Sequence, residues 1–199
     1  MAQANPLYTF DADAVAWLET RMWEAYYAKQ DARLLILLVR LVARQFGLPW
    51  RRALAVALML TRPAMRFART RGDYAAVIPD IAAAYQRLQM ECGVSFDAEE
   101  VAARELQWWI VHRHPAETGE AGLTDAIADL YAAVYRLPPA AVREAARLRA
   151  EAAILCDEGR ERDGVRGAAY WPEVSDLLQR SYRALKIAVQ LPEGARLPR

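Results

Sequence analysis

Two glutamates, Glu19 and Glu105, interrupt helical stripes that are otherwise apolar or aromatic. Residues spaced by four, three and four positions share one face of a helix, so both carboxylates are expected to face inward. Burying a carboxylate without a partner is costly, so each glutamate predicts an arginine, a tyrosine hydroxyl or a backbone donor beside it. The stripes are Val15, Glu19, Met22 and Tyr26, and Val101, Glu105, Trp108 and His112.

Two roles are open to this pair of glutamates. If the carboxylates converge, their pKa values are pushed apart, and they can act as a general acid and a general base. If each carboxylate instead pairs with a neighbouring helix, both are structural anchors. The outcome depends on how the helices that carry them are arranged.

Those helices belong to an internal repeat. The segment FDADAVAWLETRMW, from Phe10 to Trp23, returns as FDAEEVAARELQWW from Phe96 to Trp109. Further along, residues 41–57 align with 130–146, and residues 78–87 with 171–180. The offset between the copies grows along the chain, as expected when insertions fall in surface loops.

Apolar residues recur at spacings of three and four and never alternate over the length of a strand, which predicts an all-α fold. We expect about eight helices, arranged as two duplicated four-helix units in one pseudo-twofold domain. Copy one covers about 10–92 and copy two about 96–190, and 191–199 is expected to be a loose tail. Caps and prolines place the helix starts near Asp11, Asp31, Pro49, Pro79, Asp97, Thr124, Pro138 and Pro172, with loops at 114–122 and 159–167, and Pro63 is expected to kink or divide the third helix.

Composition narrows the range of partners. The formal charge is +1, from 26 basic and 25 acidic residues, so no net field attracts nucleic acid or anionic lipid. Residues 42–58 imitate a helix-turn-helix, but the second helix offers the groove few polar side chains. No apolar run approaches the about 20 residues that a transmembrane helix needs. We therefore expect neither a nucleic-acid nor a membrane partner.

Metal and cofactor signals are missing from the sequence. A carboxylate-bridged di-metal bundle needs Glu-x-x-His pairs, and Cys92 and Cys156 lack the CxxC spacing of zinc sites. Two isolated cysteines and an amino terminus without a secretory pattern favour a cytoplasmic protein. We expect no metal and no cofactor.

The favoured function is a non-catalytic binding module for an unknown small molecule or protein, because clefts between repeats commonly hold ligands. An enzyme that uses Glu19 and Glu105 as acid and base is one alternative, and a homodimeric interaction module is another. The predicted ligand site lies between the two copies and is bordered by Glu19, Trp23, Glu105, Trp109, His112 and Arg113.

Overall fold

A computed structural model describes residues 5–164 and 169–190 of the chain. Within these residues the structure is all-helical, as predicted, and has no strand. The helices are α1 (Pro6–Thr9), α2 (Ala12–Tyr27), α3 (Asp31–Phe46), α4 (Trp50–Arg69), the 3₁₀ turn η1 (Ala75–Val77), α5 (Ile78–Cys92), α6 (Ala98–Arg113), α7 (Pro115–Tyr135), α8 (Pro139–Asp163) and α9 (Trp171–Ala188).

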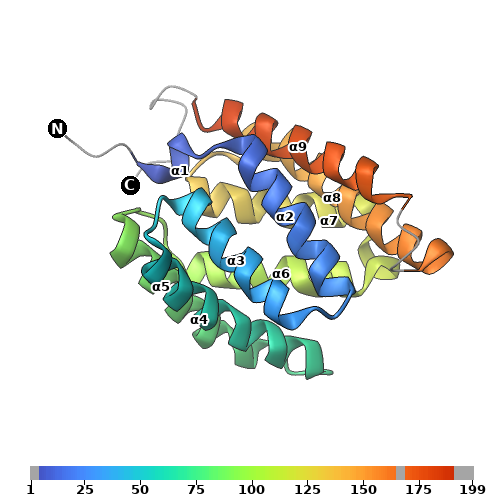
Figure 1. The fold of residues 1–199 in the computed structure, drawn as a ribbon, viewed down its shortest axis with the longest axis horizontal. Helices are drawn as coiled ribbons and strands as arrows, with labels where there is room; N and C mark the ends of the chain where they lie inside the picture. Colours follow the sequence, from blue (N-terminus) through green and yellow to red (C-terminus); the bar gives the residue numbers. More distant parts are fainter. Residues whose placement is uncertain (1–4, 165–168, 191–199) are drawn as a thin grey trace.

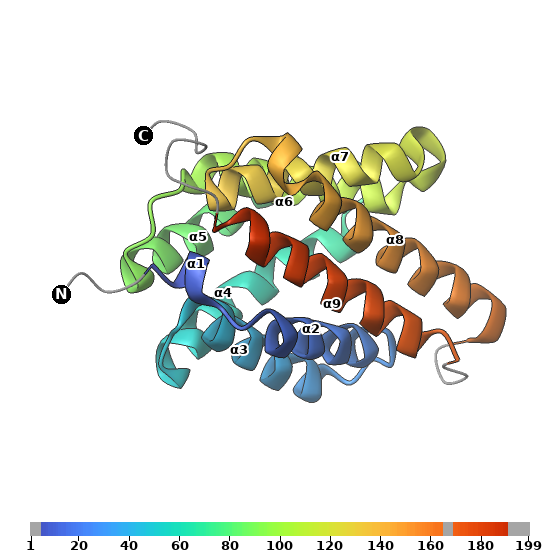
Figure 2. The same ribbon diagram turned by 90° about the horizontal axis from the view of Figure 1, so that it is seen from above.

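The longer helices form a closed series of neighbours. From α2 to α9, each helix packs on the next one along the chain, and α9 packs back on α2. Figure 1 shows α9 along one edge of the molecule and α4 along the opposite edge. Figure 2, the view from above, shows α9 lying between α2 and α8. The first and last long helices are therefore in direct contact.

Local signals set most helix ends where the sequence predicts them. Asp11 caps α2 by accepting from the amide of Ala14 at 3.1 Å, and Asp97 caps α6 by accepting from two amides of its first turn. Gly47 and Gly93 end α3 and α5 in the left-handed conformation, which glycine adopts without a Cβ penalty. These boundaries are confirmed because they depend on short-range contacts.

Three features of the helices differ from the sequence prediction, and a fourth concerns Pro63, where α4 continues without being divided. The short helix α1 was not predicted. The expected loop at 114–122 is largely helical, with a break at Gly119 where φ is 63°. Similarly, α8 continues beyond Gly159 as far as Asp163. Residues 165–168 of the second predicted loop and the predicted tail at 191–199 lie outside the described residues.

Gly159 allows the ring of Tyr170 to approach the backbone of α8. A Cβ atom at position 159 would overlap that ring, and Tyr170 is almost fully buried. The glycine inside α8 is therefore explained by a tertiary contact that a polar, glycine-containing sequence does not reveal.

Replacing Gly159 with alanine should destabilise the protein, although alanine is the better helix former. We expect overpacking against Tyr170 to cost about 1–3 kcal/mol, more than the about 1 kcal/mol gained in helix propensity. Urea unfolding measures the difference. In the Tyr170→Ala background the same substitution should become stabilising; an equal loss in both backgrounds would contradict the steric explanation.

Candidate functional site

Glu19 lies in the interior, where it joins three helices. Its side chain on α2 is 1% exposed. One oxygen, Oε1, lies 2.5 Å from an Nη2 atom of Arg149 on α8, and the other, Oε2, accepts a hydrogen bond of 2.5 Å from the Tyr182 hydroxyl on α9. The arginine and tyrosine partners that the sequence requires for Glu19 are therefore present, and both belong to the second copy.

Arg149 is surrounded by aromatic side chains as well as by Glu19. Its guanidinium donates to the Tyr131 hydroxyl at 3.1 Å and lies within 6.0 Å of the ring centroids of Trp23 and Trp108. Burial disfavours the charged form, but Glu19 and the tyrosine hydroxyls outweigh burial, so the pKa of Arg149 lies above its ordinary value. The guanidinium therefore stays charged inside the protein.

Glu105 has a different set of partners. The indole N–H groups of Trp108 and Trp109 donate to Oε1 at 3.2 and 2.9 Å, and the Tyr85 hydroxyl on α5 donates to Oε2 at 3.0 Å. Removal from water raises the pKa of Glu105 above its ordinary value, although these hydrogen bonds and the charge of Arg149 oppose the rise. Neutral donors thus replace the ion pair that Glu19 makes.

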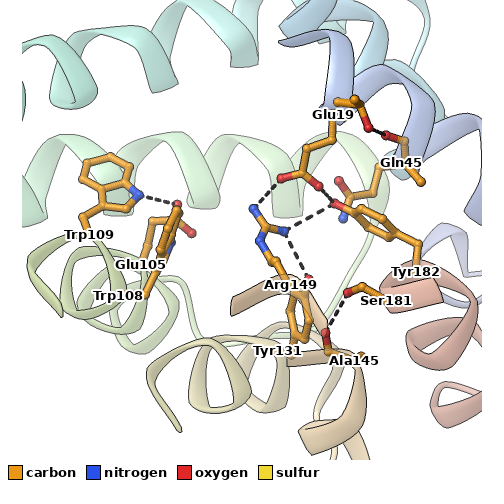
Figure 3. Close-up of polar contacts among 12 residues, drawn as sticks. Glu19, Gln45, Glu105, Trp108, Trp109, Tyr131, Ala145, Arg149, Ser181 and Tyr182 are labelled. Atoms are coloured by element: carbon orange, nitrogen blue, oxygen red, sulfur yellow. Dashed lines mark hydrogen bonds and ion pairs between the residues drawn. The ribbon is translucent and has the colours of Figure 1, made fainter. Parts of the chain in front are cut away.

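Glu19 and Glu105 have different hydrogen-bond and ion-pair partners. Figure 3 shows Arg149 lying between Glu19 and the group formed by Glu105, Trp108 and Trp109. A guanidinium between two carboxylates screens their repulsion, so this geometry does not produce the mutual pKa splitting of a paired acid and base.

The remaining predicted site residues divide between two places. His112 lies beside Trp108 and its Nε2 is 3.0 Å from an oxygen of Asp157 on α8. Arg113 points elsewhere: it donates to the carbonyls of Phe67 and Thr70 at 3.0 and 3.1 Å, and so caps the end of α4. The structure therefore brings Glu19, Trp23, Glu105, Trp109 and His112 into one polar and aromatic network around Arg149, and places Arg113 at its edge.

Asp157, which is half-buried, is a second meeting point of helices, and sequence analysis missed it. Its carboxylate accepts from the Tyr27 hydroxyl at 3.3 Å and from Arg160 at 2.9 Å. Burial would raise its pKa, but His112 and Arg160 outweigh burial, so the pKa of Asp157 lies below the usual value. This cluster links α2, α6 and α8.

Sequence analysis also missed Arg149, although its position carries a detectable signal. Arg149 lies on an apolar stripe of α8 with Val142, Ala146 and Ala153, at spacings of four, three and four. An arginine on such a stripe requires a buried acid, just as Glu19 requires a buried base. The apolar stripes of α2 and α8 thus each carry one charged residue, Glu19 and Arg149, and the two charges are opposite in sign.

An open pocket lies at the surface between α2 and α9. Its volume is about 450 Å³. Trp17 forms one exposed wall, with 47% of its surface accessible, and the Arg21–Glu24 ion pair, 2.6 Å long, forms the rim. The lining residues are Trp17, Thr20, Arg21, Glu24, Trp171, Pro172 and Ser175.

The described residues contain no group of three or more His, Cys, Asp and Glu side chains that could hold a metal ion. Over the same residues, no helix combines the length and apolarity that crossing a membrane requires.

Arg149→Ala should destabilise the protein by about 3–5 kcal/mol, because it leaves the Glu19 carboxylate buried without its counter-ion. The double variant Glu19→Leu with Arg149→Leu should recover most of that loss, since it removes both charges. Arg147→Ala is the matched control on α8: its pairs with Glu144 and Glu151 are exposed, so we expect at most about 1 kcal/mol. Chemical denaturation of the four proteins measures these differences, and a small loss for Arg149→Ala would refute the anchoring role.

Glu105→Gln should change how stability depends on pH. Because the folded state raises the pKa of Glu105 above 4.5, it binds that proton more tightly than the unfolded chain does. The wild-type protein therefore loses this contribution as pH rises from the unfolded pKa through the raised one. The glutamine variant has no such loss, so its free energy of unfolding relative to wild type should increase as pH rises from the unfolded pKa of about 4.3 through the raised pKa of the folded state.

Glu158→Gln, at an exposed position of α8, serves as the control for this pH series. Parallel curves for wild type and Glu105→Gln would show that Glu105 does not titrate differently in the folded protein.

No family model, curated protein or solved structure shows significant similarity to the chain. The chemistry of the site is therefore inferred from the residues of this chain.

Proposed function

We propose that the protein is a non-catalytic binding module and that it holds a small molecule between its two copies. The observation that carries this proposal is the open pocket at the contact of α2 with α9, because α2 begins the first copy and α9 ends the second. The pocket volume of about 450 Å³ is within the range of small-molecule sites.

The chemistry of the pocket suits a ligand with a flat ring and a polar end. The exposed indole of Trp17 supplies a stacking face. Arg21 and Glu24 offer a cation and an anion at the rim, and Ser175 adds a hydroxyl group. A zwitterionic or amide-containing aromatic molecule would satisfy these groups.

The buried network around Arg149 supports the pocket from behind. Glu19 and Thr20 are adjacent on α2, and Thr20 lines the pocket. Because Glu19 is tied to both Arg149 and Tyr182, the helices that form the two walls are held in register. In this proposal Glu19 and its predicted companions position the site and do not themselves contact the ligand.

The acid–base alternative receives less support. Both oxygens of Glu19 are occupied by Arg149 and Tyr182, and the side chain is buried. A general acid or base must come within hydrogen-bond reach of the substrate. Substrate access to Glu19 would require these contacts to break.

We also propose that the chain is an internal duplication that forms one pseudo-twofold domain. Aligned residues play the same local roles: Asp11 and Asp97 cap α2 and α6, and Gly47 and Arg136 end α3 and α7 in the left-handed conformation. The contact of α5 with α6 corresponds to that of α9 with α2. The larger apolar core draws on both copies.

A cytoplasmic setting is part of the proposal, since Cys92 and Cys156 are both free thiols and disulfides are rare in that compartment.

Ligand-observed NMR with a library of small polar aromatic molecules tests the site. Hits for the wild-type protein should bind Trp17→Ala about 10-fold more weakly, because a lost aromatic stacking contact is worth about 1.5 kcal/mol. Trp50→Ala removes another exposed indole, which lies on α4, and it should leave the affinities unchanged. A library without hits, or hits that ignore Trp17, would reject the proposed pocket.

A further inference from the structure

The outer face of α3 and α4 carries large apolar side chains that are exposed or only partly buried. On α4, Trp50, Leu54, Leu58 and Met65 follow one another at helical spacings of four, four and seven. Ile36 and Val39 lie on the outer side of α3, which packs against α4. Ile36 is 59% exposed, Trp50 63%, Leu58 49% and Met65 56%. We call these six residues the apolar band.

The apolar band is not a general property of this fold. Arg143 and Arg147 of α8 align with Leu54 and Leu58 of α4 in the repeat. Both arginines are paired with neighbouring acids, namely Asp125, Glu144 and Glu151. The corresponding face of the second copy is thus polar and satisfied by its own salt bridges. Large exposed apolar patches on a soluble protein mark interaction sites.

The charged side chains that α3 and α4 carry beside the apolar band are nearly all positive. Asp31, at the start of α3, is the only acidic residue of the two helices. Arg52 and Arg66 of α4 pair with Glu91 and Asp80 of α5. Within the described part of the chain, four further exposed arginines have no acidic partner within salt-bridge distance: Arg40 and Arg44 on α3, and Arg51 and Arg69 on α4.

These arginines lie on both sides of the band. One residue advances a helix by about 100°, which places Arg51 and Arg69 next to Leu58 on the side of α4 that faces away from α3. On α3, Arg40 and Arg44 lie beyond Ile36, on the side that faces away from α4. The apolar surface is therefore bordered by positive charge along both long edges. Figure 1 shows the two helices side by side.

We propose that this surface docks an amphipathic helix of a partner protein whose flanks are acidic. Apolar residues of that helix cover the band, and its Asp and Glu side chains meet the free arginines. From Trp50 to Met65 the band runs about 22 Å, which corresponds to about four turns of a docked helix. This surface lies apart from the α2–α9 pocket, and its function does not depend on that pocket.

The positive charges beside the apolar band favour an acidic helix over two other possible occupants, a second copy of the chain and an anionic membrane. In a symmetric dimer formed through the band, arginines would face arginines, which opposes association. An anionic membrane would attract the same arginines, but the rest of the molecule adds little to that attraction because the net charge is only +1. A protein helix senses charges within about 8 Å of the contact at physiological salt, where this surface is strongly basic.

Two synthetic helical peptides of about 18 residues test the proposal. Both carry the same Leu and Trp stripe; one has Glu along both flanks, and the other has Lys. Fluorescence anisotropy should show that the Glu peptide binds the full-length protein at least about 10-fold more tightly than the Lys peptide, and more weakly as salt is raised. Equal binding of the two peptides, or no binding of either, would overturn the proposal.

Variants locate the binding surface. Leu58→Glu places a charge in the centre of the band and should weaken binding of the Glu peptide about 10-fold or more. Ile187→Glu makes the same change at another exposed apolar position. It lies on α9, the helix at the edge of the molecule opposite α4 (Figure 1), and should leave binding unchanged. Circular dichroism verifies that both variants are folded.

Two further measurements test the competing occupants. Preferential binding to vesicles that contain phosphatidylglycerol, lost in Leu58→Glu, would replace the helix with a membrane. A concentration-dependent dimer that Leu58→Glu abolishes would replace it with a second copy of the chain. Binding of the Glu peptide should also survive Trp17→Ala, which separates this surface from the small-molecule pocket.

Discussion

The buried ion pair between Glu19 and Arg149 is the interaction on which the arrangement of the helices depends. Removing two charges from water is expensive, and only close pairing with further hydrogen bonds offsets the cost. Tyr182 and Tyr131 supply those bonds. Because the partners lie on α2, α7, α8 and α9, a shift of any one of these helices leaves a charge or a hydroxyl without its partner. The main effect of the pair is thus to restrict the core to one register. Its net contribution to the free energy of folding is smaller, because desolvation offsets much of the attraction.

The two aligned glutamates solve the same burial problem in different ways. Glu19 uses a charged partner, whereas Glu105 accepts only from the neutral donors of two indoles and a phenol. In the sequence alignment Leu60 of α4 stands opposite Arg149 of α8. In both cases one donor is a tyrosine, from α9 for Glu19 and from α5 for Glu105. Both glutamates thus have a tyrosine partner, and they differ in whether a charged partner is also in contact.

This asymmetry continues on the surface. Several charged side chains on α8 are paired in salt bridges. In contrast, α4 exposes Trp50, Leu58 and Met65 beside Arg51 and Arg69, which have no acidic partner within salt-bridge distance among the described residues. The pocket between α2 and α9 is of a third kind, with an aromatic wall and a rim of both charges. A rigid interior and chemically distinct outer faces suit a protein that acts by binding, because recognition is then set by which side chains each face presents.

What the sequence determined by itself is the local structure: the all-helical fold and the ends capped by Asp11, Asp97, Gly47 and Gly93, whose decisive contacts span only a few residues. It also determined that Glu19 and Glu105 must be buried with partners, because helical periodicity fixes the face on which each side chain lies. Only the tertiary structure decided which partners these are. Arg149 and Tyr182 are more than a hundred residues from Glu19, and Arg113 turned out to cap α4 because a long flexible side chain takes its direction from its neighbours in space. The close approach of Tyr170 to Gly159 of α8 is likewise a tertiary contact that local propensity does not encode.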